Sequence, residues 1–368
     1  MWKYLAKRLL LFIPSLLLLV LLCFGLLRIA PGDPMAHLLR NPDNEFSGEL
    51  TDPILLRHLN EQTGLNLPVF YFSIQPVSTF GWKKFIPGLD FHLDNQWKRW
   101  IFGNKNFGGL IRGDFGNSLI TNEKVSALIS SRIIWSILPS LLSLFLAYLV
   151  SVPAGIRMAT KPNSFTSRKA TVLFNILFSL PTFWIALLLL MCFANPYMLN
   201  WLPATGVAPT NGFSPELNSF TKAIKTIPYL ILPVFCYTYG AFAFLSSTLS
   251  QTLESILTTD FIRTARAKGL PEKQVIQKHA YRNALLPMIT LLSQAFPAII
   301  GGSVIIETIF SIPGMGLTIY QAIASKDYPV IVAIFFITGF ITMTGFLIAD
   351  VLYAYADPRI RYSREVIK

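Results

Sequence analysis

The residues of this chain that could carry out chemistry are few, and none stands at a catalytic spacing. The sequence has no Gly-x-x-x-x-Gly-Lys-Ser/Thr loop, no His-Glu-x-x-His pair, no Gly-x-Ser-x-Gly turn and no Cys-x-x-Cys pair. Asp90-Phe-His92-Leu-Asp94 is more typical of a solvated loop than of a metal site. We therefore expect no catalytic, cofactor-binding or metal-binding residues and no enzymatic activity. The cysteines stand inside apolar stretches, as small packing residues do: Cys23, Cys192 and Cys236.

Ionisable side chains at membrane depth are the usual sign of a proton or ion relay. In this chain Arg28, Glu307 and Asp350 stand at the ends of apolar stretches. A proton-coupled secondary transporter is expected to place an acid near the middle of the bilayer. We instead expect Glu307 to be an interfacial carboxylate that caps a local turn, and Asp350 to form hydrogen bonds or ion pairs at the inner edge. The pattern indicates a conduit whose energy source lies in another chain.

The elements that must position these residues are six uncharged apolar blocks of 19 or more residues. About 20 helical residues cross a hydrocarbon core of ~30 Å. Only 14% of the residues are charged, against about a quarter in soluble domains. Because the alternation of a membrane β-barrel is absent, we predict an all-α polytopic membrane protein with six transmembrane helices. The blocks are Leu9–Leu27, Ile133–Ile156, Ala170–Ala194, Thr226–Leu253, Ala284–Ile306 and Tyr328–Ala349.

Basic residues are distributed unevenly over the segments that connect these blocks. Four alternate segments together hold 17 Lys and Arg against five Asp and Glu, whereas the short connections on the other side hold three Lys. The positive-inside rule therefore places both termini in the cytoplasm. Topology explains most of the net charge of +12, and nucleic acid is not expected as a partner. The basic segments are 1–8, 157–169, 254–283 and 351–368; the short opposite ones are 195–225 and 308–327.

The blocks divide the chain into four parts. The second part is a long outer segment, and its tryptophans and cations at 82–84 and 97–100 are typical of a small folded element at the membrane surface or against a receptor. The parts are the helix 1–29, the outer segment 30–132 with a probable insertion at 72–110, a core of five helices at 133–354 with a basic loop at 254–284, and a cytoplasmic tail at 355–368.

The basic loop carries signals for two short helices joined by a corner. Thr259 is suited to cap the first helix, and Gly269 stands where a left-handed residue ends it. A second helix is expected from Pro271 to about Leu286, before Pro287. The first helix has a small apolar face, made of Phe261, Ile262 and Ala265, between basic residues. These signals predict a compact knob rather than a loose loop.

The segment Phe261-Ile-Arg-Thr-Ala-Arg-Ala-Lys-Gly-Leu, with His279-Ala-Tyr-Arg-Asn-Ala-Leu-Leu-Pro287, resembles the "EAA" loop of ABC importer permeases, closest to the dipeptide/oligopeptide/nickel branch. The resemblance covers nearly the whole chain except roughly 72–110. Arg263 stands where the wider family has Glu, as is usual in the peptide branch. Other matching pieces are Tyr4–Leu11, Ala30–Pro34, Gly113–Ser118, Glu307–Gly316, Asp327–Pro329 and Asp357–Tyr362.

This resemblance implies a type I ABC importer permease fold in the bacterial cytoplasmic membrane. It implies pairing with a second homologous permease, two ATPase subunits that use the ATP, and an extracytoplasmic substrate-binding protein. It also implies that the knob is a coupling helix. The residues expected to contact the ATPase are Phe261, Arg263, Thr264, Ala265, Arg266, Lys268 and Gly269.

The sequence thus favours a permease subunit that forms half of a channel for oligopeptides, dipeptides or a similar solute. One alternative is a stand-alone secondary transporter or channel. Another is an intramembrane enzyme with chemistry in the long outer segment. Neither explains the capped, basic knob at 254–284.

Overall fold

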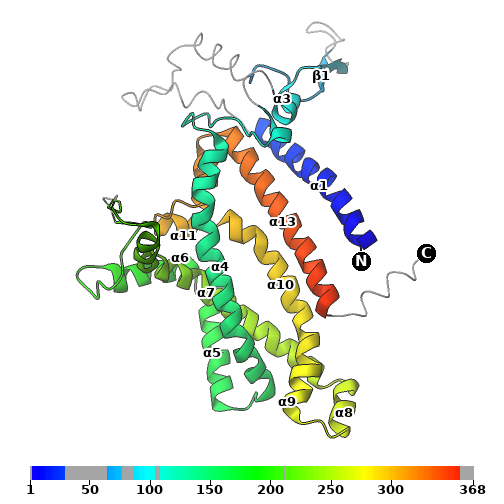
Figure 1. The fold of residues 1–368 in the computed structure, drawn as a ribbon, viewed down its shortest axis with the longest axis vertical. Coiled ribbons are helices and arrows are strands. Elements are labelled where there is room, and N and C mark those ends of the chain that lie inside the picture. The colour runs from blue at the N-terminus through cyan, green and yellow to red at the C-terminus, as the bar shows by residue number, and fades with distance from the viewer. Residues whose placement is uncertain are drawn as a thin grey trace. The chain divides into compact units, whose positions relative to one another are not determined.

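The computed structural model describes residues 2–29, 64–76, 87–103, 108–209, 212–214 and 216–356 of the chain (Figure 1). Three predictions made above fall outside the described residues. These concern the motif Ala30–Pro34, the side chains of Trp82, Lys83 and Lys84, and the tail from Asp357.

Long apolar helices dominate the described residues, as predicted. Five helical runs are long and apolar enough to cross a membrane, and a bent pair of helices brings the number to six if it counts as one span. The five lie in α1 (Trp2–Ile29), α4 (Val125–Thr160), α7 (Ser219–Leu257), the run from α9 (Glu272–Gln274) through η5 (Val275–Ala280) and α10 (Tyr281–Gly301) to α11 (Val304–Ile309), and α13 (Tyr328–Ala356). The predicted fold class is confirmed.

The bent pair is the third predicted block. It consists of α5 (Phe165–Ser179), followed by α6 (Thr182–Leu189) and the π-helical turn η4 (Leu190–Ala194), and the two parts meet at 96°. The break falls at Leu180, whose φ of −83° and ψ of 127° are extended. A residue before proline is disfavoured in the helical region, so Pro181 accounts for the break.

Another proline does not interrupt its helix. We predicted that the second helix of the basic loop ends near Leu286, but α10 continues through Pro287 to Gly301. Proline removes one hydrogen bond of the helix and so usually ends or kinks it. Spanning helices tolerate this loss because neighbouring groups satisfy the freed carbonyl.

The described chain divides into two compact units. Unit 1 comprises residues 1–12, 132–318 and 338–368. It contains the elements from α5 to α11, among them the short helix α8 (Asp260–Ala267). Its largest apolar cluster joins Ala147 of α4, Leu249 and Leu253 of α7, and Val275 and Ala284 of the run that starts at α9. This cluster extends to the basic loop and is the core on which α8 rests.

Unit 2 comprises residues 13–131 and 319–337 and contains the described part of the outer segment. The described part of this segment is folded, as predicted, and it includes a hairpin that the sequence did not predict; its outer location stays a prediction. Strands β1 (Phe72–Pro76) and β2 (Pro87–Phe91) pair antiparallel, with Phe72 opposite Phe91, and are followed by α3 (Gln96–Phe102) and η3 (Leu110–Arg112). The element packs on α1 and α13, through Trp100 against Val20, Phe24 and Val332.

Candidate functional site

The basic loop forms the predicted knob, with α8 between two defined ends. Thr259 is the N-cap residue with extended backbone, but its hydroxyl donates to Ile256 O at 2.6 Å and makes no capping bond to the helix. At the other end Gly269 has a φ of +78° and donates its N–H to Arg266 O at 2.9 Å. A side chain is strained in this left-handed conformation, so Gly269 provides the predicted corner.

One face of α8 is anchored in unit 1. Ile262 is fully buried and Ala265 is 6% exposed, in the same cluster as Leu253 of α7 and Val275 and Ala280 of η5. Both side chains therefore pack against helical runs that cross the membrane. Because protein interiors are close-packed and transmit strain, a displacement of α8 must move these helices with it.

A salt bridge ties the end of α8 to the start of the next helix. Arg266 Nη2 lies 2.7 Å from Glu272 Oε1, and its Nε donates to Oε2 at 3.1 Å. This two-point contact raises the pKa of Arg266 above its ordinary value. Arg266 precedes Gly269 and Glu272 follows it, so the salt bridge joins the two ends of the corner and restricts the backbone geometry between them.

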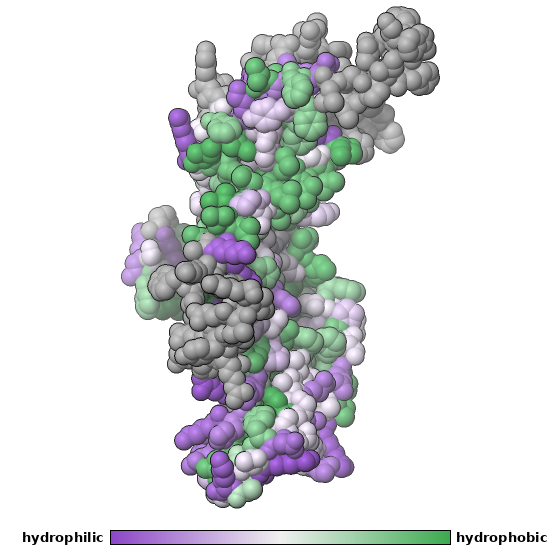
Figure 2. Space-filling view, turned by 90° about the vertical axis from the view of Figure 1, so that its right-hand side faces the viewer, coloured by the Kyte–Doolittle hydropathy of each residue, from purple (hydrophilic) through white to green (hydrophobic). Residues whose placement is uncertain are grey.

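The opposite face of α8 is exposed and basic. Phe261 is 47% exposed, and Arg263, Lys268 and Thr264 are exposed as well. Figure 2 shows hydrophilic side chains gathered at the lower end of that view, where α8 lies. Of the seven residues predicted to contact an ATPase, six are exposed here and Ala265 faces the core of its own chain.

A second polar site lies inside unit 1, around Glu307 of α11. Its side chain is 1% exposed, so the expected interfacial carboxylate is in fact buried. Oε1 accepts a hydrogen bond from Ser136 Oγ at 2.7 Å, and Oε2 accepts one from Leu317 N at 2.7 Å. Ser136 Oγ in turn accepts from Met315 N at 2.7 Å. The expected capping role is confirmed, since the carboxylate satisfies the first turn of α12 (Met315–Ala324).

Glycines make room for this carboxylate. A Cβ at Gly302 would lie 1.9 Å from Glu307 Oε1, and a Cβ at Gly314 would lie 2.4 Å from Glu307 Cδ. Any other residue at these positions would displace the acid. Sequence reasoning missed this cage, although the signal was present as glycines on both sides of Glu307.

A third polar contact joins two of the family-like motifs within unit 2. Asp327, at the turn before α13, is buried and accepts hydrogen bonds from Ser118 Oγ and from Leu119 N, the latter at 3.1 Å. Ser118 ends the motif that starts at Gly113, so the two motifs are adjacent in space. The contact was not predictable from local sequence patterns, because the two residues are 209 positions apart in the chain.

Asp350 forms an ion pair with Arg8 within unit 1, which confirms the expected ion pair; its place at the inner edge stays a prediction. Among the described residues, no three His, Cys, Asp or Glu side chains gather where they could hold a metal ion.

Comparisons with known proteins show what the chain is similar to. Residues 151–362 match the family described as "Binding-protein-dependent transport system inner membrane component". This stretch contains α8, Glu307 with its neighbouring glycines, and four of the candidate spans. These are the bent pair, α7, the run from α9 to α11, and α13.

Curated relatives match over nearly the full chain. The oligopeptide transport system permease protein AppB of Bacillus subtilis is 35% identical, over 98% of this chain and 100% of its own length. The oligopeptide permease OppB of Haemophilus influenzae is 32% identical, and the dipeptide permease DppB of Alkalihalophilus pseudofirmus is 31% identical, each over 98% of this chain and 100% of the relative. A solved structure of the MetNI methionine ABC transporter has a TM-score of 0.46 at 16% identity, over 63% of this chain and 97% of that one.

Proposed function

Because the chain belongs to the family of binding-protein-dependent transport system inner membrane components, we propose that it is a permease subunit of an ATP-driven ABC importer. It forms half of a translocation channel, and its solute is an oligopeptide, a dipeptide or a chemically similar molecule. Full-length similarity to oligopeptide and dipeptide permeases supports this substrate class.

The observation that carries the proposal is the construction of the α8 knob. A helix whose apolar face packs into the core of its own chain and whose other face is basic and exposed suits force transmission to a separate subunit. A stand-alone transporter has no need for such a lever on one side of the membrane. The chain itself hydrolyses nothing, and ATP is used by its partners.

The exposed face of α8 docks on an ATPase subunit. Phe261 supplies an apolar contact at its centre, and Arg263 and Lys268 supply cations for carboxylates on the partner. Thr264, Arg266 and the Gly269 corner complete the contact surface. Ala265 contributes from behind, since its small side chain lets α8 lie close to η5.

The complete importer contains this permease, a second homologous permease, two ATPase subunits and an extracytoplasmic substrate-binding protein. The basic segments 157–169 and 254–283 lie in the cytoplasm, together with both termini, in a bacterial cytoplasmic membrane. The proposal divides the chain into the four parts assigned from sequence, with the permease core at 133–354.

Uptake by right-side-out membrane vesicles, or by proteoliposomes that hold the nucleotide in their lumen, tests this function. The chain is coexpressed with the second permease, the ATPase subunits and the substrate-binding protein of its importer, and accumulation of a labelled peptide is measured with ATP and with a non-hydrolysable analogue. We expect ATP-dependent accumulation that needs the substrate-binding protein. Accumulation driven by a proton gradient without ATP would contradict the proposal and favour a secondary transporter.

A further inference from the structure

The hairpin of unit 2 exposes large apolar side chains at one end. Phe91 is 80% exposed and Leu93, two residues later, is 82% exposed, and Phe72 lies opposite Phe91 in the sheet. Ser73 and Asp90 form the next pair and are polar. Opposite residues share a face of the sheet, and neighbouring residues along a strand point to opposite faces. The sheet is therefore amphipathic, with the aromatic pair on one face and the polar pair on the other. In water such exposure is unfavourable, by about 25 cal/mol for each Å² of apolar surface.

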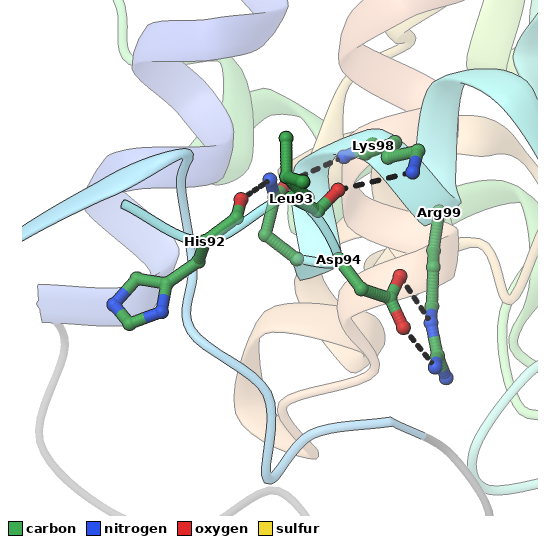
Figure 3. Close-up of polar contacts among 6 residues, drawn as sticks. His92, Leu93, Asp94, Lys98 and Arg99 are labelled. Carbon is green, nitrogen blue, oxygen red and sulfur yellow. Dashed lines mark hydrogen bonds and ion pairs between the residues drawn. The ribbon is translucent and has the colours of Figure 1, made fainter. Parts of the chain in front are cut away.

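The exposed Leu93 is held in a fixed loop between β2 and α3 (Figure 3). Lys98 Nζ donates to the carbonyl oxygen of Leu93 at 3.0 Å, and Arg99 donates to both carboxylate oxygens of Asp94, at 3.1 and 2.6 Å. The hydrogen bond from Arg99 lowers the pKa of Asp94, so this pair stays ionised. Asn95 closes the loop, accepting from Lys98 N at 2.8 Å. Apolar tips on a preorganised support are typical of a binding surface.

The position of the hairpin along α1 is set by direct contacts. Phe70 packs against α1, since its ring lies 6.1 Å from that of Phe24 and a Cβ at Gly25 would lie 3.5 Å from its Cζ. Phe24 lies five residues before the end of α1 at Ile29, which is about 8 Å at 1.5 Å per residue. Phe72 follows Phe70 by two residues, a reach of at most about 7 Å. The hairpin therefore begins beside the last described turns of this helix, which is long and apolar enough to span the membrane.

The adjoining side chains fit the same level. Trp97 stacks on Trp100 at 6.0 Å and lies 5.6 Å from the Phe24 ring, within the last two turns of α1. Tryptophan is enriched at the boundary between hydrocarbon and headgroups. The exposed apolar stripe of α1, a helix long and apolar enough to span the membrane, continues to Leu26 and Ile29.

We propose that the hairpin and the Leu93 loop form a membrane-interface anchor, in which Phe72, Phe91 and Leu93 insert among phospholipid headgroups beside α1. Lys98 of α3 is exposed and uses one of its three N–H donors on Leu93 O, so the others suit lipid phosphates beside the loop. The occupant is phospholipid because the surface continues the lipid-facing stripe of a spanning helix and starts at the depth of its last turns. This anchor fixes the outer segment against the bilayer, and it does so whichever side of the membrane the segment occupies.

The test places a short-linker fluorophore on Phe91→Cys and on Leu93→Cys in the full chain, reconstituted in phosphatidylcholine nanodiscs that contain a headgroup-nitroxide lipid. Asp90→Cys is the matched control, one residue from Phe91 and on the polar face of the hairpin. The unmodified chain, labelled in parallel, gives the background from its three native cysteines. We expect several-fold stronger quenching and a blue-shifted emission at 91 and 93 relative to 90.

Equal quenching at 90, 91 and 93 would overturn the proposal. It would also be overturned if the labels at 91 and 93 were unquenched by the nitroxide lipid but became shielded on addition of a substrate-binding protein, since the surface would then be a protein docking site. A label on Phe72→Cys repeats the test if a loop variant fails to reconstitute. None of these readouts depends on transport, so failure here leaves the proposed permease function standing.

Discussion

Substitution of Gly269 tests the backbone geometry of the knob without changing any of its polar or charged side chains. A Cβ at this position would meet no other atom within 4 Å, so a side chain there causes no external clash. What remains is the backbone cost, because φ is +78°. Replacing glycine by a residue with a Cβ costs about 1 kcal/mol or more of conformational free energy at this φ, and β-branching adds to that cost. A loss of 1–2 kcal/mol lowers the population of the native corner roughly 5–30-fold relative to its alternatives.

We therefore expect Gly269→Val to insert normally and to bind the ATPase with an apparent affinity reduced by up to this factor, since affinity scales with the competent fraction. The assay combines subunit copurification with peptide uptake and ATP hydrolysis in vesicles. Gly269→Asn is the rescue control, because asparagine tolerates a left-handed backbone. Gly212→Val is the matched control for strain, with a φ of +73° and no atom within 4 Å of its Cβ. Wild-type affinity and uptake in Gly269→Val would refute the reasoning.

Four further outcomes are expected. Ala265→Asp buries a carboxylate in the cluster under α8, so the permease should remain in the membrane but lose copurifying ATPase. Glu307→Gln leaves a buried donor without an acceptor and should lower stability by about 1–3 kcal/mol in thermal unfolding. The N–H groups of Gly108 and Gly116 lower the pKa of Asp114, so its stabilising effect is present above the unfolded pKa of about 3.9 and is lost as pH falls through the lower folded value. Cysteines at Asn163 and Ser214 should differ in reactivity to an impermeant maleimide applied from outside, with Asn163→Cys protected.

Each of these outcomes has its own control. Ala324→Asp places the same charge on an exposed alanine outside the knob, and an equal loss of ATPase at 265 and 324 would contradict the burial argument. Glu216→Gln changes an exposed carboxylate and should leave unfolding unchanged. The stability difference between wild type and Asp114→Asn should vanish at low pH; a constant difference would exclude the linkage. Reversed labelling at Asn163 and Ser214 would place the knob away from any cytoplasmic ATPase.

Local signals in the sequence predicted much of the fold. The apolar blocks marked the spanning helices because hydrocarbon allows little else, and Gly269 marked the corner because only glycine adopts its φ readily. The effect of proline was harder to judge. Pro181 breaks its span by 96°, whereas Pro287 lies within a continuous helix. The local rule is the same for both, and the surrounding packing decides the outcome.

Contacts between distant segments were not predictable from one sequence. Ser136 and Glu307 are 171 residues apart, and Ser118 and Asp327 are 209 apart, so no periodicity or local spacing joins either pair. The direction of Ala265 was also hidden, because the apolar face of α8 suits its own chain and a partner equally well. The β1–β2 hairpin was not predicted, because a strand of five residues is too short for its alternating pattern to be distinctive.

Site-specific cross-linking from α8 tests the central claim most directly. Cysteine is introduced at Phe261 and at Lys268, two exposed positions of the knob, and at Ser214 as the control in a different connection. A short bifunctional reagent is applied to native membranes, and the products are identified by mass spectrometry. We expect both α8 positions, and not Ser214, to cross-link to an ATPase subunit with a nucleoside-triphosphate loop. Absence of that product at both positions, in membranes that import peptide in an ATP-dependent manner, would show that α8 is not the coupling helix.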